Sequence, residues 1–194
     1  MPTLQFTRWG QDPTSNSLIS PGVAADKRYR LAMTMQVPAL VASDEGEHFH
    51  FLNILYTSKI RSDQTNGALT VMEFLGFKNF APPLHRHDAE DELLYVLDGE
   101  VWFSCGDVEA VHGTGAMVWL PRGLAHTFQV RSETARVLQV SCPGQFERFV
   151  AALGRPSAEP VLPAPEEIDP VHVAQVCSQF SIQVVGPPPP PMAE

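Results

Sequence analysis

The chain has 194 residues, 44% of them hydrophobic, and its formal net charge of −9 argues against nucleic acid as a partner. No apolar run reaches the roughly 18–20 residues that a membrane-spanning helix needs, and no membrane association is expected. The first ten residues lack the pattern of a secretory signal, and Cys105, Cys142 and Cys177 are too widely spaced for a Cys-x-x-Cys metal site, so we expect a reduced, cytoplasmic protein.

The first third of the chain contains a polar segment followed by strand-like runs. Residues 1–26 are rich in Pro, Ser, Thr and Gly and are predicted to form an arm with little structure of its own. Residues 29–41 and 49–60 carry enough large and β-branched side chains for one strand each. Residues 62–67 end in Asn-Gly and predict a hairpin connection to the alternating strand at 68–77.

The middle of the chain consists of short predicted strands separated by turns. Asp98-Gly99 is a strong hairpin signal between two of them, and the strands at 124–130 and 136–141 are expected to pair as the last two of the sheet. The remaining strands are predicted at 85–87, 92–97, 100–104, 107–111 and 116–120. This spacing is typical of an all-β sandwich or barrel.

Two helices are predicted after the strands. Residues 145–153 place apolar side chains on one face, and Gly154 and Pro156 end that helix. Asp169 is a candidate N-cap for the second helix, whose apolar stripe (Val173, Val176, Cys177 and Phe180) we interpret as core. Residues 181–185 predict a final strand. The prolines at 187–191 predict a stiff tail, either an inert terminus or a ligand for a proline-recognising domain.

Four side chains suggest a metal site. Residues i and i+2 of a strand face the same way, so His85 and His87 can direct both imidazoles at one point, and Glu92 follows five residues later. His126, at the start of a strand after a Pro-x-Gly turn, can complete the set. Three imidazoles and a carboxylate suit one divalent transition metal, with Fe, Ni, Mn, Co, Cu and Zn all open.

Two motifs around these residues resemble the signatures of the cupin superfamily. They are His85-x-His87-x4-Glu92-x6-Gly99 and Gly115-x5-Pro121-x-Gly123-x2-His126, separated by residues 100–114. The sequence departs from the common pattern in the longer stretch between Gly76 and His85. It departs again at Val130, where asparagine is frequent. The resemblance implies a single antiparallel β-barrel, the double-stranded β-helix or jelly roll.

The resemblance also implies a division of the chain. It places the barrel at residues 27–142, with the motifs at about 76–130. A helical extension at 143–186 would pack on the barrel, and a tail would follow at 187–194. The segment after the barrel looks like the post-barrel helix of bacterial quercetin 2,3-dioxygenase-like monocupins.

For function, the resemblance implies a metal-dependent dioxygenase that uses O2 to open a flavonol-like aromatic substrate, with Glu92 as both ligand and catalytic base. Phe74, Phe103, Trp119 and Phe128 are candidate walls of the substrate pocket, or plain barrel core. The alternatives are a non-oxidative metal-dependent isomerase, epimerase or cyclase, and a non-enzymatic ligand-binding barrel. Exposed barrel edges suggest a homodimer.

Overall fold

The computed structural model describes residues 38–192, and all statements about structure concern that part of the chain. The predicted arm at residues 1–26 lies outside the described residues. So does most of the predicted strand at 29–41, whose last residues, 38–41, have no regular structure.

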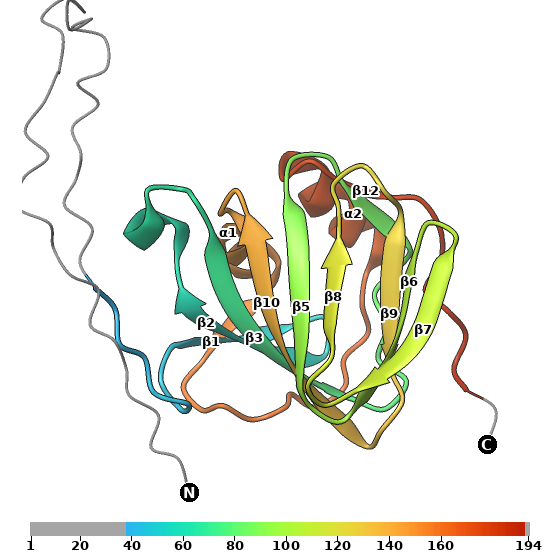
Figure 1. Ribbon diagram of the computed structural model, residues 1–194, viewed down its shortest axis with the longest axis horizontal. Helices are drawn as coiled ribbons and strands as arrows, with labels where there is room; N and C mark the ends of the chain where they lie inside the picture. The colour runs from blue at the N-terminus through green and yellow to red at the C-terminus, as the bar shows by residue number, and fades with distance from the viewer. Residues whose placement is uncertain (1–37, 193–194) are drawn as a thin grey trace, which may run out of the picture. The chain divides into compact units, whose positions relative to one another are not determined.

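Two antiparallel sheets enclose one apolar core, which confirms the predicted all-β barrel with two short helices (Figure 1). The larger sheet has the order β11-β1-β2-β3-β10-β5-β8, and the smaller one has the order β12-β4-β9-β6-β7. The strands of the larger sheet are β1 (Glu47–Phe51), β2 (Ile54–Ile60), β3 (Thr70–Phe77), β5 (Asp91–Asp98), β8 (Met117–Leu120), β10 (Thr134–Cys142) and β11 (Arg155–Ser157). Those of the smaller sheet are β4 (His85–His87), β6 (Glu100–Cys105), β7 (Val108–Gly113), β9 (His126–Val130) and β12 (Ile182–Val184).

Alternation along the central strands determines which side chains face the barrel interior. In β3 the residues Thr70, Met72 and Phe74 are buried while their neighbours are only half-buried. In β10 the buried positions include Gln139 and Ser141, so this strand presents polar groups as well as apolar ones to the core. A buried amide needs a hydrogen-bond partner, and the partner of Gln139 lies in the site described below.

Two predictions about the strands are corrected by the structure. The run at 49–60 is a hairpin, because Leu52 and Asn53 turn the chain between β1 and β2 with φ angles of 49° and 69°. The strands at 124–130 and 136–141 do not pair, since β9 lies between β4 and β6 whereas β10 lies between β3 and β5. Pro156 follows the first helix as expected but belongs to the edge strand β11, where a missing N–H is tolerated.

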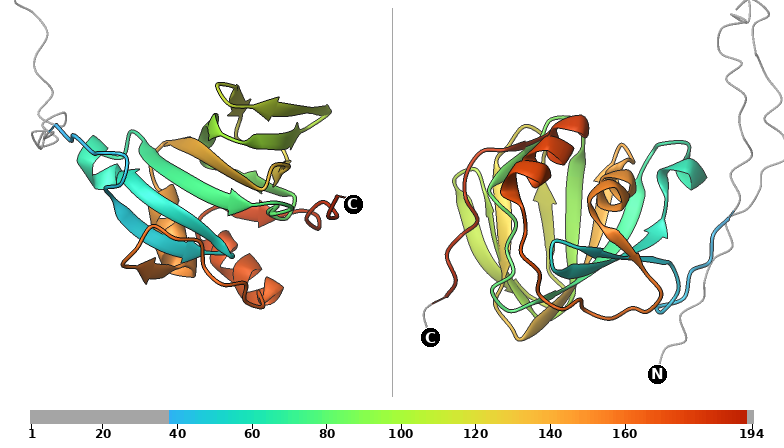
Figure 2. Two further views of the ribbon diagram at one scale, coloured as in Figure 1. Left: turned by 90° about the horizontal axis from the view of Figure 1, so that it is seen from below. Right: turned by 180° about the vertical axis from the view of Figure 1, so that it is seen from behind.

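The two predicted helices are present, as α1 (Phe146–Leu153) and α2 (Pro170–Gln179), and they pack against each other (Figure 2). Asp169 caps α2, its side chain accepting a hydrogen bond from Val171 N at 2.9 Å. No helix among the described residues has the length and apolar character that crossing a membrane requires.

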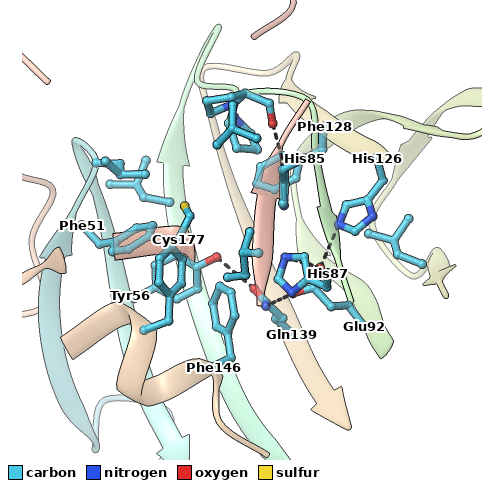
Figure 3. Close-up of a pocket in the computed structure, with 18 of the residues that line it drawn as sticks. Phe51, Tyr56, His85, His87, Glu92, His126, Phe128, Gln139, Phe146 and Cys177 are labelled. Carbon is cyan, nitrogen blue, oxygen red and sulfur yellow. Dashed lines mark hydrogen bonds and ion pairs between the residues drawn. The ribbon is translucent and has the colours of Figure 1, made fainter. Parts of the chain in front are cut away.

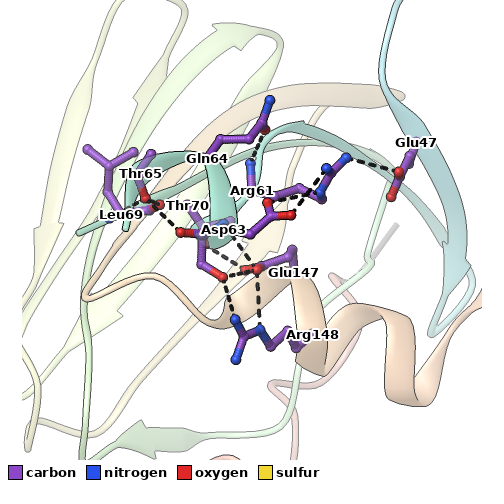
Figure 4. A network of polar contacts seen from close by, with 10 residues as sticks. Glu47, Arg61, Asp63, Gln64, Thr65, Leu69, Thr70, Glu147 and Arg148 are labelled. Atoms are coloured by element: carbon purple, nitrogen blue, oxygen red, sulfur yellow. Dashed lines mark hydrogen bonds and ion pairs between the residues drawn. The ribbon is translucent and has the colours of Figure 1, made fainter. Parts of the chain in front are cut away.

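A buried carboxylate attaches α1 to the larger sheet (Figure 4). Glu147 is 7% exposed and accepts hydrogen bonds from the Ser62 backbone N–H at 3.1 Å, the Ser62 hydroxyl and Thr70 Oγ1 at 2.7 Å. Ser62 begins the short 3-10 helix η2 (Ser62–Thr65), and Arg148 donates to its hydroxyl at 3.1 Å. This network fixes the start of α1, the helix that contributes aromatic side chains to the site.

The proline-rich tail lies along the barrel. Leu84 N donates to Pro187 O, the buried Gln129 donates its amide to Pro190 O at 2.9 Å, and Met192 N donates to Asn79 Oδ1 at 3.0 Å. Hydrogen bonds therefore hold the described part of the tail, which we call the strap, against the smaller sheet.

Candidate metal centre

The four predicted ligands converge on one point inside the barrel (Figure 3). One potential ligand atom from each of His85, His87, Glu92 and His126 lies within 4.8 Å of the others. They come from β4, β5 and β9, and His85 is the register partner of His126 across the smaller sheet. Within the part of the chain that the structure describes, no other group of His, Cys, Asp and Glu side chains gathers in this way.

A hydrogen bond at Nδ1 orients the ring of each of the three histidines. His85 Nδ1 lies 2.7 Å from Pro83 O, and His126 Nδ1 lies 3.0 Å from Leu124 O. Because a carbonyl only accepts, each Nδ1 must carry the proton, which leaves the Nε2 lone pair free. His126 Nε2 is buried and has no hydrogen-bond partner, so the structure contains an acceptor that a cation would satisfy.

Glu90 orients the ring of the third histidine, His87, through a hydrogen bond at Nδ1. Its Oε1 lies 2.8 Å from His87 Nδ1, and its side chain is 1% exposed. A carboxylate that holds a metal-ligating imidazole from behind fixes the ring and raises its basicity. Glu90 was not among the predicted site residues, although a carboxylate three residues after a candidate ligand is a signal present in the sequence.

The two oxygens of Glu92 have different surroundings. Oε2 faces the histidines, 3.3 Å from His126 Nε2 and 3.9 Å from His87 Nε2. Oε1 points away and accepts a hydrogen bond from Gln139 Nε2 at 2.5 Å. Gln139 in turn accepts from Tyr56 OH at 2.9 Å. Burial and the charge of Glu92 raise the pKa of Tyr56 well above its usual value, so the phenol is a donor at neutral pH.

Burial and the neighbouring charges shift the pKa values of Glu92, His85 and His87 in different directions. Burial opposes the charge on Glu92, but His87 and His126 more than offset it and lower the pKa of Glu92 to about 2. Burial and the two other imidazoles lower the pKa of His85 to about 3, so its ring is neutral. Burial also opposes charge on His87, but Glu92 and Glu90 more than offset it and raise the pKa of His87. The anionic Glu92 and the neutral His85 fit a divalent transition metal. The raised pKa of His87 favours its charged ring, so a bound cation would have to displace a proton from that side chain.

The site opens into an apolar cavity of about 60 Å³. Its walls come from both sheets and from the C-terminal extension, which places Phe146, Phe149, Val173, Cys177 and Ile182 over the barrel interior. The helices α1 and α2 lie on one side of the barrel (Figure 2), and together with β12 they contribute side chains to the wall of the cavity. The arrangement offers a buried cation site beside an apolar space.

The four aromatic side chains predicted to form the pocket walls occupy different places. Phe128 lines the cavity, and Phe74 stacks behind it with ring centroids 5.0 Å apart. Phe103 and Trp119 instead line a separate depression together with residues of β6, β7 and β8, and Trp119 is 54% exposed. The structure therefore brings Phe128 close to the four ligands and leaves Trp119 at the surface.

The other described histidines lie away from the metal ligands. His48 Nδ1 lies 2.9 Å from Thr57 Oγ1, and His50 Nε2 lies 3.1 Å from Val161 O. His112 borders the depression beside Phe103, and His172 is exposed on α2.

Comparison with known proteins gives one family and one curated relative. Residues 78–141 match the family model described as a cupin domain. The chain is similar to quercetin 2,3-dioxygenase of Bacillus subtilis (strain 168), with 25% identity over 121 residues. That match covers 62% of this chain and 36% of the relative, so the chain spans little more than a third of the relative's length.

Two solved structures are similar to part of this chain. An RmlC-like cupin from Shewanella frigidimarina is 15% identical, with a TM-score of 0.49, and the match covers 59% of this chain and 99% of that one. KdgF from Halomonas sp. is 14% identical, with a TM-score of 0.45, and the match covers 50% of this chain and 84% of that one.

Proposed function

We propose that this chain, which belongs to the cupin superfamily through its domain at residues 78–141, is a metal-dependent dioxygenase of a flavonol-like aromatic substrate. The observation that carries the proposal is the set of four converging ligand atoms at the edge of an apolar cavity. The similarity to a bacterial quercetin 2,3-dioxygenase supports the choice of reaction.

His85, His87, Glu92 and His126 would hold the cation. Four protein ligands leave one or two positions open on a five- or six-coordinate metal, as a catalytic site requires. When bound, the metal would supply Lewis acidity that lowers the pKa of a substrate hydroxyl and would provide a site for reaction with O2.

The protein's own contribution begins with Glu92. This carboxylate is ionised at neutral pH and lies at the cation site, so it can accept the proton of the substrate's 3-hydroxyl. Opening of the heterocyclic ring by O2 would then release carbon monoxide. Phe128 from the smaller sheet and Phe146 from α1 provide apolar walls that exclude water from the reacting atoms.

The cavity is small for such a substrate. Its volume is about 60 Å³, and side chains of α1, α2 and β12 form part of its wall. A flavonol would therefore need α2, which contributes Val173 and Cys177 to the cavity wall, to move outward before it could enter. We include this movement in the proposal.

The same small volume favours a second candidate function. A non-oxidative isomerase, epimerase or cyclase acting on a smaller metabolite would use the same ligands and would need no movement of α2. A third reading, a barrel that binds a ligand without turnover, predicts binding by the metal-loaded protein and no product.

Measurements of oxygen and carbon monoxide separate these functions. Metal-loaded protein should consume O2 and release carbon monoxide in equal amounts when flavonols are added in air. Glu92→Gln should remove turnover more completely than it removes metal, because the amide keeps one ligand oxygen but accepts no proton. Product formation without O2 would establish the non-oxidative function, and failure of the protein to retain any transition metal would refute both enzymatic proposals.

A further inference from the structure

A chain of two buried hydrogen bonds ends on the carboxylate ligand (Figure 3). Tyr56 OH donates to Gln139 Oε1 at 2.9 Å, and Gln139 Nε2 donates to Glu92 Oε1 at 2.5 Å. Both side chains are 3% exposed, and they come from β2 and β10 in the larger sheet. Neither is needed as a ligand or as a base in the function proposed above.

The orientation of the Gln139 amide follows from its hydrogen-bond partners, which are Glu92, Tyr56 and, at 3.3 Å from Nε2, Ser141 Oγ. An ionised carboxylate only accepts hydrogen bonds, so the amide must turn its NH2 group toward Glu92. Its oxygen then faces Tyr56, whose hydroxyl has a proton to donate. Reversing the amide would place two acceptors against each other in a buried site, which is costly. Tyr56 therefore fixes Gln139, and Gln139 fixes Glu92.

This arrangement has a consequence for coordination. The Gln139 amide holds Glu92 Oε1 away from the histidines, and only Oε2 faces their Nε2 atoms. Carboxylates bind metals through one oxygen or through both. A hydrogen bond to one oxygen favours metal binding through the other oxygen alone. If the amide were absent, Oε1 would have no partner in this buried site and could turn toward the cation.

We propose that Gln139, oriented by Tyr56, is a positioning residue that restricts Glu92 to one metal-bound oxygen and so keeps a coordination position open for substrate. The inference deepens the proposed function and rests on the part of it that assigns a divalent cation to the four ligands. It does not depend on which substrate is turned over.

The test uses Co²⁺ as the probe metal and azide as the probe of an open position, in the full-length protein. Visible absorption of Co²⁺ weakens as its coordination number rises, so a second bound oxygen of Glu92 has a spectroscopic signature. Gln139→Met keeps the side-chain length and removes the hydrogen bonds. Gln129→Met is the matched control, because Gln129 is an equally buried glutamine that bonds to Pro190 O on the strap rather than to a ligand.

Wild type and Gln129→Met should show the same Co²⁺ absorption and the same azide affinity. In Gln139→Met the absorption should weaken and the azide affinity should fall at least tenfold. Tyr56→Phe keeps the ring and removes only the hydroxyl, so it should shift both readouts in the same direction by a few-fold. This milder variant keeps the test decisive even if Gln139→Met does not fold.

Two failures have different meanings. Unchanged spectra and azide affinity in Gln139→Met, or in Tyr56→Phe where only that variant folds, would overturn the positioning role and leave the metal site intact. Failure of wild type to bind Co²⁺ would overturn this inference together with the proposed function.

Discussion

Removal of the carboxylate behind His87 should weaken metal binding even though Glu90 is not itself a ligand. The His87 ring is held by one polar contact at Nδ1, the 2.8 Å hydrogen bond to Glu90 Oε1. Loss of such a partner typically lowers metal affinity by about 10–100-fold, which corresponds to about 1.4–2.7 kcal/mol. Glu90 is 1% exposed, so no bulk water is available to replace it, and we expect Glu90→Ala to lie in the upper half of that range.

Glu90→Gln should have a smaller effect. The amide oxygen can still accept from His87 Nδ1, but the negative charge that increases the basicity of the imidazole is lost. We therefore expect a reduction in affinity of about threefold to tenfold, below that of Glu90→Ala. The order of the two variants separates the loss of ring orientation from the loss of charge.

The measurement is a competition for Zn²⁺ or Co²⁺ between the protein and a coloured chelator at fixed pH. Glu109→Ala is the matched control, because it removes the same charge from an exposed position on β7. An affinity of Glu90→Ala within threefold of the Glu109→Ala value would show that the orientation of His87 does not depend on Glu90, contrary to the reasoning above.

Two further predictions concern stability and access. Burial raises the pKa of Glu147, but hydrogen bonds from Ser62 and Thr70 more than offset it and lower the pKa below the usual 4.5. Glu147→Gln should therefore lower the free energy of unfolding by about 2 kcal/mol at pH 7. Urea titrations should show this difference present above pH 4.5 and lost as the pH falls through the folded-state pKa, whereas a constant difference would contradict the assignment. Burial also raises the pKa of the Cys177 thiol to about 11, so iodoacetamide should label Cys177 more slowly than Cys142 in metal-loaded protein. Equal labelling rates would mean that α2 opens freely.

The parts of the fold with a local signal in the sequence were predictable. Gly99 adopts a φ of 87°, as the Asp-Gly hairpin between β5 and β6 requires, and Asp169 caps α2. The i,i+2 spacing of His85 and His87 indicates their shared face within β4, and the Pro-x-Gly turn marks the start of the strand that carries His126. These features depend on residues close together in the chain.

The features that the sequence did not reveal depend on contacts between distant residues or on rare backbone angles. The β1–β2 hairpin turns at Leu52 and Asn53, both at positive φ. Glycine, asparagine or aspartate usually occupies such positions, and because Leu52 is none of these, the sequence did not indicate the turn. Alternation in β9 and β10 indicates which side chains are buried but not which strand lies beside which, and the pairing of these two strands was predicted wrongly. Trp119 was a reasonable pocket candidate by composition, yet its strand turns it outward.

The strand that carries two of the ligands depends on the C-terminal extension. Within the smaller sheet, β4 meets β9 at the single register pair His85–His126, whereas it pairs with β12 at three positions, including His87 with Ile182. Residues 182–184 lie outside the segment that matches the cupin domain, yet they hold the histidine strand in place. Any movement that lifts β12 away would also loosen His85 and His87. If the proposed function holds, we expect a flavonol to enter by displacement of α2 while β12 stays paired with β4, because the metal site depends on that pairing.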